Sequence, residues 1–239
     1  MNIKIRSEID HVAANVVQYI IYIVFVSSLI GLINLFFPTV IPFKFLETWS
    51  WGGSLSEGLL NSWPIFLWAF TATGLAVVIT RNERLENLLA EGYLKEGAIT
   101  SVVAGFFEEI VFRWLMFFTA IATAQLMNFL SFGLVEWFYD TVVAPFINFL
   151  TFGGIESILY HPLGWFVGAA MVTANGHFRD GHKYLGIVGY LNSWFIGFFF
   201  FWIMFNFGLI TAIVVHFLYD MLIFTVGYID RVIERHQER

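Results

Sequence analysis

A small set of acidic and basic side chains lies inside sequence that is otherwise apolar. The segment from Gly105 to Arg113 carries Glu108, Glu109 and Arg113 among Phe, Ile and Val. A charge in the bilayer core costs about 2.5–3.5 kcal/mol on insertion scales, so such residues are rare and usually functional. At about 100° per residue, Glu109 and Arg113 share one helix face and can pair, whereas Glu108 lies away from that face. Glu108 is therefore the candidate general base.

Later apolar segments carry residues that could complete a site around Glu108. His216 and Asp220 are four residues apart and share one helix face, and His177 ends another apolar segment. If these apolar segments cross a membrane in the orientation predicted below, Glu108 and His216 lie at a similar depth from its cytoplasmic face. Each of these residues alone has an ordinary structural explanation. Together, a buried base and two imidazoles are typical of a site that activates water.

Composition indicates which kind of protein must position these residues. The chain has 239 residues, of which 59% are hydrophobic and 13% are charged, against roughly 25% charged in an average soluble domain. The net charge of −6 argues against a nucleic-acid partner. The chain has no Cys, which excludes disulfides, thiolate metal sites and cysteine nucleophiles. The composition therefore predicts a multi-pass membrane protein whose surroundings are the lipid bilayer.

Runs without charge locate five of the six membrane spans, and the sixth, at about 98–127, carries charges inside it. We predict an all-α, polytopic bundle that forms a single membrane domain over 1–239. Its six predicted spans are about 15–37, 59–80, 98–127, 162–178, 184–206 and 208–228. The charge-free run from Tyr184 to Tyr219 is too long for one span, which predicts a break near Asn206-Phe207-Gly208. We identify no internal repeat.

The segment 129–161 is apolar but contains Glu136, Asp140 and Glu156. We interpret it as an interfacial or re-entrant excursion; a pair of extra spans there would give eight. Ten of the twelve basic residues flank one side of the predicted spans and only Lys44 flanks the other. The orientation rule then predicts cytoplasmic termini and an excursion on the outer side. The charged segment 81–96 is expected to form a short helix on the cytoplasmic surface.

The charged residues resemble the three motifs of the CAAX prenyl protease family, also called CPBP intramembrane glutamic endopeptidases (type II CAAX prenyl endopeptidase-like). Its EExxxR motif corresponds to Glu108-Glu109-Ile-Val-Phe-Arg113. Its FxxxH motif is assigned here to the segment that ends at His177, although Thr173 occupies the usual Phe position. Its HxxxN or HxxxD motif corresponds to His216-Phe-Leu-Tyr-Asp220. The resemblance covers about 98–225, which would be the catalytic core.

This resemblance implies metal-independent hydrolysis of a peptide bond, with no cofactor. Glu108 and His177 would activate water, and His216 with Asp220 would stabilise the oxyanion. Glu109 and Arg113 would support the site. An ionised Asp220 cannot donate to an oxyanion, so Asp220 is either protonated or orients His216. The implied substrate is a peptide or a lipidated protein, such as a prenylated CaaX C-terminus.

Several alternatives stay open at this point. His161 is a rival to His177, but it lies at the outer end of its predicted span. A zinc protease is the nearest enzymatic alternative, with ligands from Glu108, His177, His216 and Asp220, although the sequence has no HExxH and His177 and His182 are five residues apart. A non-catalytic scaffold or a proton-coupled transporter would also use intramembrane Glu, His and Asp. The orientation fits a prokaryotic plasma membrane or a eukaryotic endoplasmic reticulum.

Overall fold

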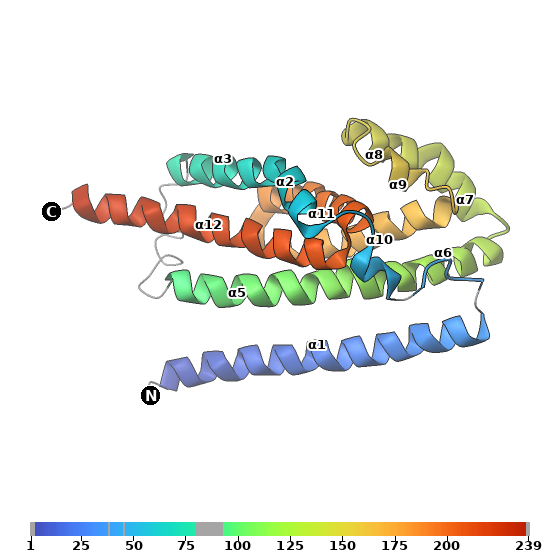
Figure 1. Cartoon of the computed structure of the whole chain (residues 1–239), viewed down its shortest axis with the longest axis horizontal. Helices are drawn as coiled ribbons and strands as arrows, with labels where there is room; N and C mark the ends of the chain where they lie inside the picture. Colours follow the sequence, from blue (N-terminus) through green and yellow to red (C-terminus); the bar gives the residue numbers. More distant parts are fainter. Residues whose placement is uncertain (1–2, 38, 45, 80–92, 238–239) are drawn as a thin grey trace. The chain divides into compact units, whose positions relative to one another are not determined.

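The computed structural model is helical (Figure 1). It describes residues 3–37, 39–44, 46–79 and 93–237, and no strand occurs in these ranges. The all-α prediction is therefore confirmed for them. Residues 81–92 of the expected surface helix lie outside the described residues.

The chain divides into two compact units, each made of two separate stretches. Unit 1 comprises Met1–Phe45 with Ile110–His177, and unit 2 comprises Leu46–Glu109 with Phe178–Arg239. One boundary falls directly after the two adjacent glutamates and the other directly after His177. The candidate site residues are thus distributed over both units.

Three helices in the described residues are long and apolar enough to cross a membrane. They run over Gly97–Leu130, Lys183–Phe207 and Leu209–Ile229. They correspond to the predicted spans 98–127, 184–206 and 208–228. The other three predicted spans, 15–37, 59–80 and 162–178, overlap the helices α1 (Ile3–Phe36), α3 (Trp63–Ile79) and α10 (Trp165–Gly181).

Unit 1 contains α1, α10 as far as His177, and a set of shorter helices. They are the π-helical segment η2 (Glu109–Met116, of which the first residue belongs to unit 2), α6 (Phe117–Leu130), α7 (Leu134–Phe138), the π-helical η3 (Tyr139–Val143), α8 (Ala144–Leu150) and α9 (Glu156–Leu159). The first two residues of the predicted excursion 129–161 end the membrane-length helix Gly97–Leu130, and the rest of the excursion consists of short helices and turns. The core of unit 1 includes Phe43, which packs against the rings of Phe117 and Phe118. At Gly168 a Cβ would lie 2.5 Å from the Leu159 carbonyl oxygen, so only glycine allows this close packing.

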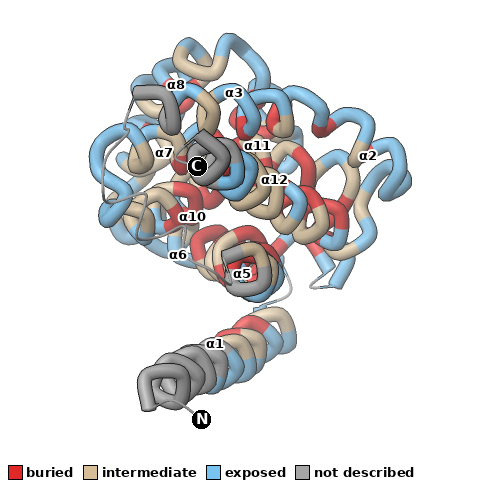
Figure 2. The backbone as a smooth tube through the Cα atoms, turned by 90° about the vertical axis from the view of Figure 1, so that its left-hand side faces the viewer, coloured by how far each residue is buried: buried red, intermediate tan, exposed pale blue. Residues whose placement is uncertain are grey.

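Unit 2 is built around α12 (Leu209–Gln237), which packs on α3, on α5 (Tyr93–Glu108) and on α11 (Gly186–Phe207). Short segments complete it: η1 (Glu47–Ser50), α2 (Leu55–Asn61) and η4 (Lys183–Leu185). Buried positions, red in Figure 2, gather in the second half of α11, whereas most of the described surface of α3 is exposed. Polar groups tie three of these helices together, because Trp68 donates to Asn192 (2.7 Å) and Asn192 donates to Tyr219 (3.4 Å).

The predicted break between the last two helices is confirmed at Gly208. α11 ends at Phe207 and α12 begins at Leu209. Gly208 has a φ of 84°, in the left-handed region that favours glycine, and a Cβ there would lie 2.8 Å from the carbonyl oxygen of Trp49. The turn lets α12, which carries His216, pack back along α11.

Candidate active site

Glu108 is the last residue of α5, at the point where the helix changes geometry. From Glu109 to Met116 the backbone is π-helical, and such segments are frequent at functional sites. The 100° spacing used to pair Glu109 with Arg113 assumed an α-helix, so that angle does not apply here. The segment still separates the two glutamates: the Glu108 side chain is 23% exposed and the Glu109 side chain is fully buried.

Glu109 holds the imidazole of His216. The distance between His216 Nδ1 and Glu109 Oε1 is 2.7 Å, across 107 positions of the sequence. A carboxylate only accepts, so Nδ1–H donates this bond and the neutral ring carries its lone pair on Nε2. The orienting role considered for Asp220 is thus held by Glu109, a residue expected from the sequence to pair with Arg113.

His182 presents its ring in the same tautomer. Its Nδ1 lies 2.8 Å from the carbonyl oxygen of Phe178, one turn back along the chain. A carbonyl oxygen only accepts, so Nδ1–H again donates, and the Nε2 of His182 carries the lone pair. The two rings are therefore held by different acceptors but expose the same nitrogen.

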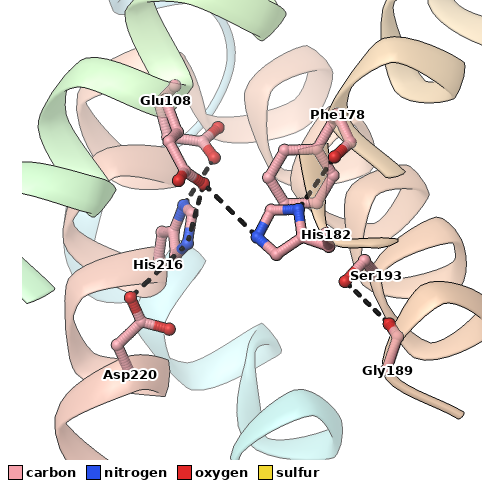
Figure 3. A network of polar contacts seen from close by, with 8 residues as sticks. Glu108, Phe178, His182, Gly189, Ser193, His216 and Asp220 are labelled. Carbon is pink, nitrogen blue, oxygen red and sulfur yellow. Dashed lines mark hydrogen bonds and ion pairs between the residues drawn. The ribbon is translucent and has the colours of Figure 1, made fainter. Parts of the chain in front are cut away.

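The Nε2 atoms of both rings face the carboxylate of Glu108 (Figure 3). Glu108 Oε2 lies 3.9 Å from His182 Nε2 and 4.0 Å from His216 Nε2. These distances are too long for direct hydrogen bonds. Among the described residues this buried oxygen has no hydrogen-bond partner. Each gap has room for a water molecule that donates one proton to the Glu108 carboxylate and the other to an imidazole Nε2.

Aromatic rings fix the two imidazoles and limit access to them. Phe200 stacks on His216 with ring centroids 4.4 Å apart. Phe178 lies 4.6 Å from the His182 ring and 6.2 Å from the His216 ring, edge-on to the latter. An apolar wall of this kind strengthens electrostatic interactions between the groups that it encloses.

Asp220 lies one helical turn after His216 on α12. Its Oδ2 is 3.7 Å from His216 Nε2, beyond hydrogen-bond distance. Asp220 therefore faces the same nitrogen as Glu108 does (Figure 3), rather than the nitrogen that Glu109 holds. The sequence left two roles for Asp220, a protonated donor or the group that orients His216. Glu109 holds the orienting position, because it is the carboxylate bonded to Nδ1 of His216.

The turn that carries His182 is fastened by Asp180. The Asp180 carboxylate accepts from Arg179 (2.8 Å) and from the Tyr190 hydroxyl (3.1 Å), and it pairs with Lys183 (3.1 Å). Arg179 in turn covers the Tyr190 ring at 4.6 Å. The hydrogen bonds from Arg179 and Lys183 lower the pKa of Asp180 from 3.8 to about 2. These contacts link the end of α10 to the start of α11.

The structure distributes the predicted site residues unevenly. It brings together Glu108, Glu109, His216 and Asp220 within unit 2. His177 belongs to unit 1 and is exposed on α10, so its role beside Glu108 stays a prediction. Arg113 is fully buried in the π-helical segment, and its pairing with Glu109 also stays a prediction. The rival His161 lies in a turn where its Nδ1 accepts from the Leu163 amide.

His182 is the site residue that the sequence interpretation missed. The sequence interpretation weighed it only against the zinc alternative, through its spacing of five residues from His177. The signal was nevertheless present: Phe178 precedes it by four residues, so Phe178-Arg-Asp-Gly-His182 fits FxxxH, whereas the segment ending at His177 has Thr173 at the Phe position. The structure gives this phenylalanine two functions, since its carbonyl and its ring both contact His182.

Within the parts of the chain that the structure describes, no group of three or more His, Asp or Glu side chains is placed to hold a metal ion. Comparisons with protein-family models, with curated proteins and with solved structures find no match to this chain.

Proposed function

We propose that the chain is a multi-pass membrane endopeptidase that hydrolyses a peptide bond with water activated by Glu108 and His182. One observation carries the proposal: the carboxylate of Glu108 faces the Nε2 atoms of two histidines. The tautomer of each ring is set by an acceptor at its Nδ1, which is the Phe178 carbonyl for His182 and the Glu109 carboxylate for His216. Such a set binds and deprotonates water. The resemblance to the CAAX prenyl protease motifs supports the same reaction.

The proposed reaction uses each group in a defined role. Water held between Glu108 and His182 attacks the scissile carbonyl carbon, and its proton passes to the Glu108 carboxylate. His216 takes a proton from solvent on Nε2 before the attack, donates this Nε2–H to the oxyanion and keeps the proton when the intermediate collapses, while Glu109 stabilises the imidazolium through Nδ1–H. When the carbon–nitrogen bond breaks, Glu108 returns the proton to the leaving amine. Asp220 stabilises the protonated state of His216 through its proximity to Nε2.

The proposal includes the topology. The six spans predicted from the sequence place both termini in the cytoplasm, and Glu108 then faces the cytoplasmic half of the bilayer. The host membrane is a plasma membrane in a prokaryote or the endoplasmic reticulum in a eukaryote. The substrate class implied by the resemblance is a peptide near the membrane surface, with a prenylated CaaX C-terminus as the first candidate.

The test is cleavage by purified protein in lipid vesicles. The substrates are a farnesylated CaaX peptide, its unprenylated twin and a mixed peptide library, each with and without a chelator, with products identified by mass spectrometry. The proposal predicts chelator-resistant cleavage of at least one of them. Chelator-sensitive cleavage would indicate the zinc alternative. A folded protein that cuts none of them would favour the scaffold or the proton-coupled transporter.

A further inference from the structure

A nine-residue pattern occurs twice in unit 1, twenty positions apart. The copies are Asn128-Phe-Leu-Ser-Phe-Gly-Leu-Val-Glu136 and Asn148-Phe-Leu-Thr-Phe-Gly-Gly-Ile-Glu156, identical at six of nine positions. The expectation that the chain has no internal repeat is therefore wrong.

Both copies end a helix in the same way. The amide of Gly133 donates to the carbonyl of Asn128, and the amide of Gly153 donates to that of Asn148, each at 2.9 Å. The preceding amides of Phe132 and Phe152 donate to carbonyls three residues earlier, each at 3.2 Å. This hydrogen-bond pattern is the Schellman motif, which normally places glycine at the position with positive φ.

Here phenylalanine occupies that position in both turns. Phe132 has a φ of 54° and Phe152 a φ of 52°, a conformation that is sterically unfavourable for a bulky side chain. Their side chains are 99% and 96% exposed, so no intramolecular packing compensates for the strain. A strained, fully exposed aromatic residue that occurs twice in one geometry points to a contact outside the chain.

The surroundings of the two turns indicate an apolar medium. The first turn directly follows Leu130, the last residue of the 34-residue candidate span Gly97–Leu130. That helix measures about 50 Å, longer than the roughly 30 Å hydrocarbon core, so its end reaches the lipid headgroups. The helical run from Leu134 to Leu150 joins the turns over about 25 Å. Its exposed apolar residues are Leu134, Trp137, Phe138, Val142, Phe146 and Phe149.

We infer that Phe132 and Phe152 are lipid anchors that insert between phospholipid chains at the two ends of this run. Lipid fits better than a protein groove, because exposed apolar residues extend from one turn to the other, interrupted at Asp140 and Thr141, and continue directly from a membrane-length helix. No Lys or Arg occurs from 114 to 178, which suits the outer side of the membrane. The inference goes beyond the proposed function and does not depend on peptidase activity.

The absence of Cys makes a direct test possible. Phe132→Cys and Phe152→Cys are each labelled with an environment-sensitive fluorophore in nanodiscs that hold one copy of the full chain. Ser157→Cys, an exposed polar position in the same unit, is the matched control. We expect brominated phospholipid to quench the labels at 132 and 152 and to leave the label at 157 unquenched, with the opposite order for a water-soluble quencher.

Two results would overturn the inference. Labels at 132 and 152 that are as accessible to the water-soluble quencher as the label at 157 would show that the turns face water. Labels protected from water only in nanodiscs with two copies would show that the occupant is a second chain. As a second measurement, Phe132→Gly and Phe152→Gly relieve the backbone strain, so we expect an unchanged or higher Tm in detergent. If the two phenylalanines anchor the chain in lipid, the wild-type Tm should be higher in vesicles than in detergent. This difference in Tm should be smaller for the two glycine variants.

Discussion

Two carboxylates that are adjacent in the sequence have opposite roles in the structure. Glu109 is fully buried and fixes the tautomer of His216, whereas Glu108 is partly exposed and faces the lone pairs of two rings. The difference arises because neighbouring residues of a helix point in different directions. A single pair of glutamates therefore supplies both a positioning group and a base.

The partner of Glu108 is tested by comparing His182→Ala with His177→Ala. His182 lies within 3.9 Å of Glu108, and His177 is exposed in the other unit. We expect His182→Ala to lower kcat by about 10²- to 10⁴-fold, the usual contribution of acid–base catalysis, and His177→Ala to have little effect. The measurement is peptide cleavage in vesicles at saturating substrate. The reverse order of the two variants would restore His177 to the site.

Arg113 is expected to stabilise the fold rather than to react. Arg113 follows Glu109 by four residues in the sequence, and its guanidinium is fully buried. A buried charge must be compensated by other polar groups. Arg113→Ala should lower the free energy of unfolding by about 3–5 kcal/mol, measured by denaturation in detergent. Arg179→Ala, which removes a half-buried ion pair, should cost about 1 kcal/mol or less. Equal effects of the two variants would contradict this role.

At the scale of elements, the site depends on the close approach of α5 to α12. Gly105 lies one turn before Glu108, and a Cβ there would meet α12 backbone: 3.0 Å from the Phe217 nitrogen and 3.2 Å from the Ile213 carbonyl oxygen. These atoms flank His216 in the sequence. The glycine therefore sets the distance between the helix that carries Glu108 and the helix that carries His216.

Gly105→Leu should separate these helices. We expect loss of cleavage and a lower Tm, because backbone atoms of α12 cannot move aside as a side chain could. Gly74→Leu in α3 is the matched control: nothing lies within 4 Å of its Cβ position, so improved helix propensity should leave Tm unchanged or slightly higher. Full activity of Gly105→Leu would show that the spacing of α5 and α12 is not critical.

The turn from Phe178 to Tyr190 should make stability depend on acidic pH. The pKa of Asp180 is lowered to about 2 by the hydrogen bonds from Arg179 and Lys183, against 3.8 ordinarily. Its folded-state pKa lies below its unfolded-state value, so its stabilising contribution is complete above about pH 4 and is lost as the pH falls toward 2. Asp180→Asn should flatten the dependence of Tm on pH in that window. An unchanged profile in this variant would refute the role of the carboxylate.

At the scale of the whole molecule, simple physical quantities predicted much of the fold. Two of the three membrane-length helices coincide with spans located from a charge-free run, and the third coincides with the span 98–127, which was predicted in spite of its internal charges. The break at Gly208 followed from the length of one run, because a helix rises by a fixed amount per residue. The common location of Glu108, His216 and Asp220 followed from the cost of burying charge.

Other features depend on tertiary contacts that no local pattern records. The bond between Glu109 and His216 joins residues 107 positions apart. The π-helical geometry of Glu109–Met116 replaces the α-helical angle on which the pairing with Arg113 was based. His182 reaches Glu108 because the turn held by Asp180 brings it back toward α5. The repeated Phe turns are the exception, since their pattern was readable in the sequence.

The central claim is that Glu108 is the base of a hydrolytic site. The most direct test is the cleavage rate of Glu108→Gln in vesicles, beside wild type and Glu156→Gln, a change of the same chemistry at an exposed glutamate outside the site. Thermal melts of the three proteins verify that each is folded. We predict a loss of about 10²-fold or more for Glu108→Gln alone. Full activity in a folded Glu108→Gln protein would contradict the account.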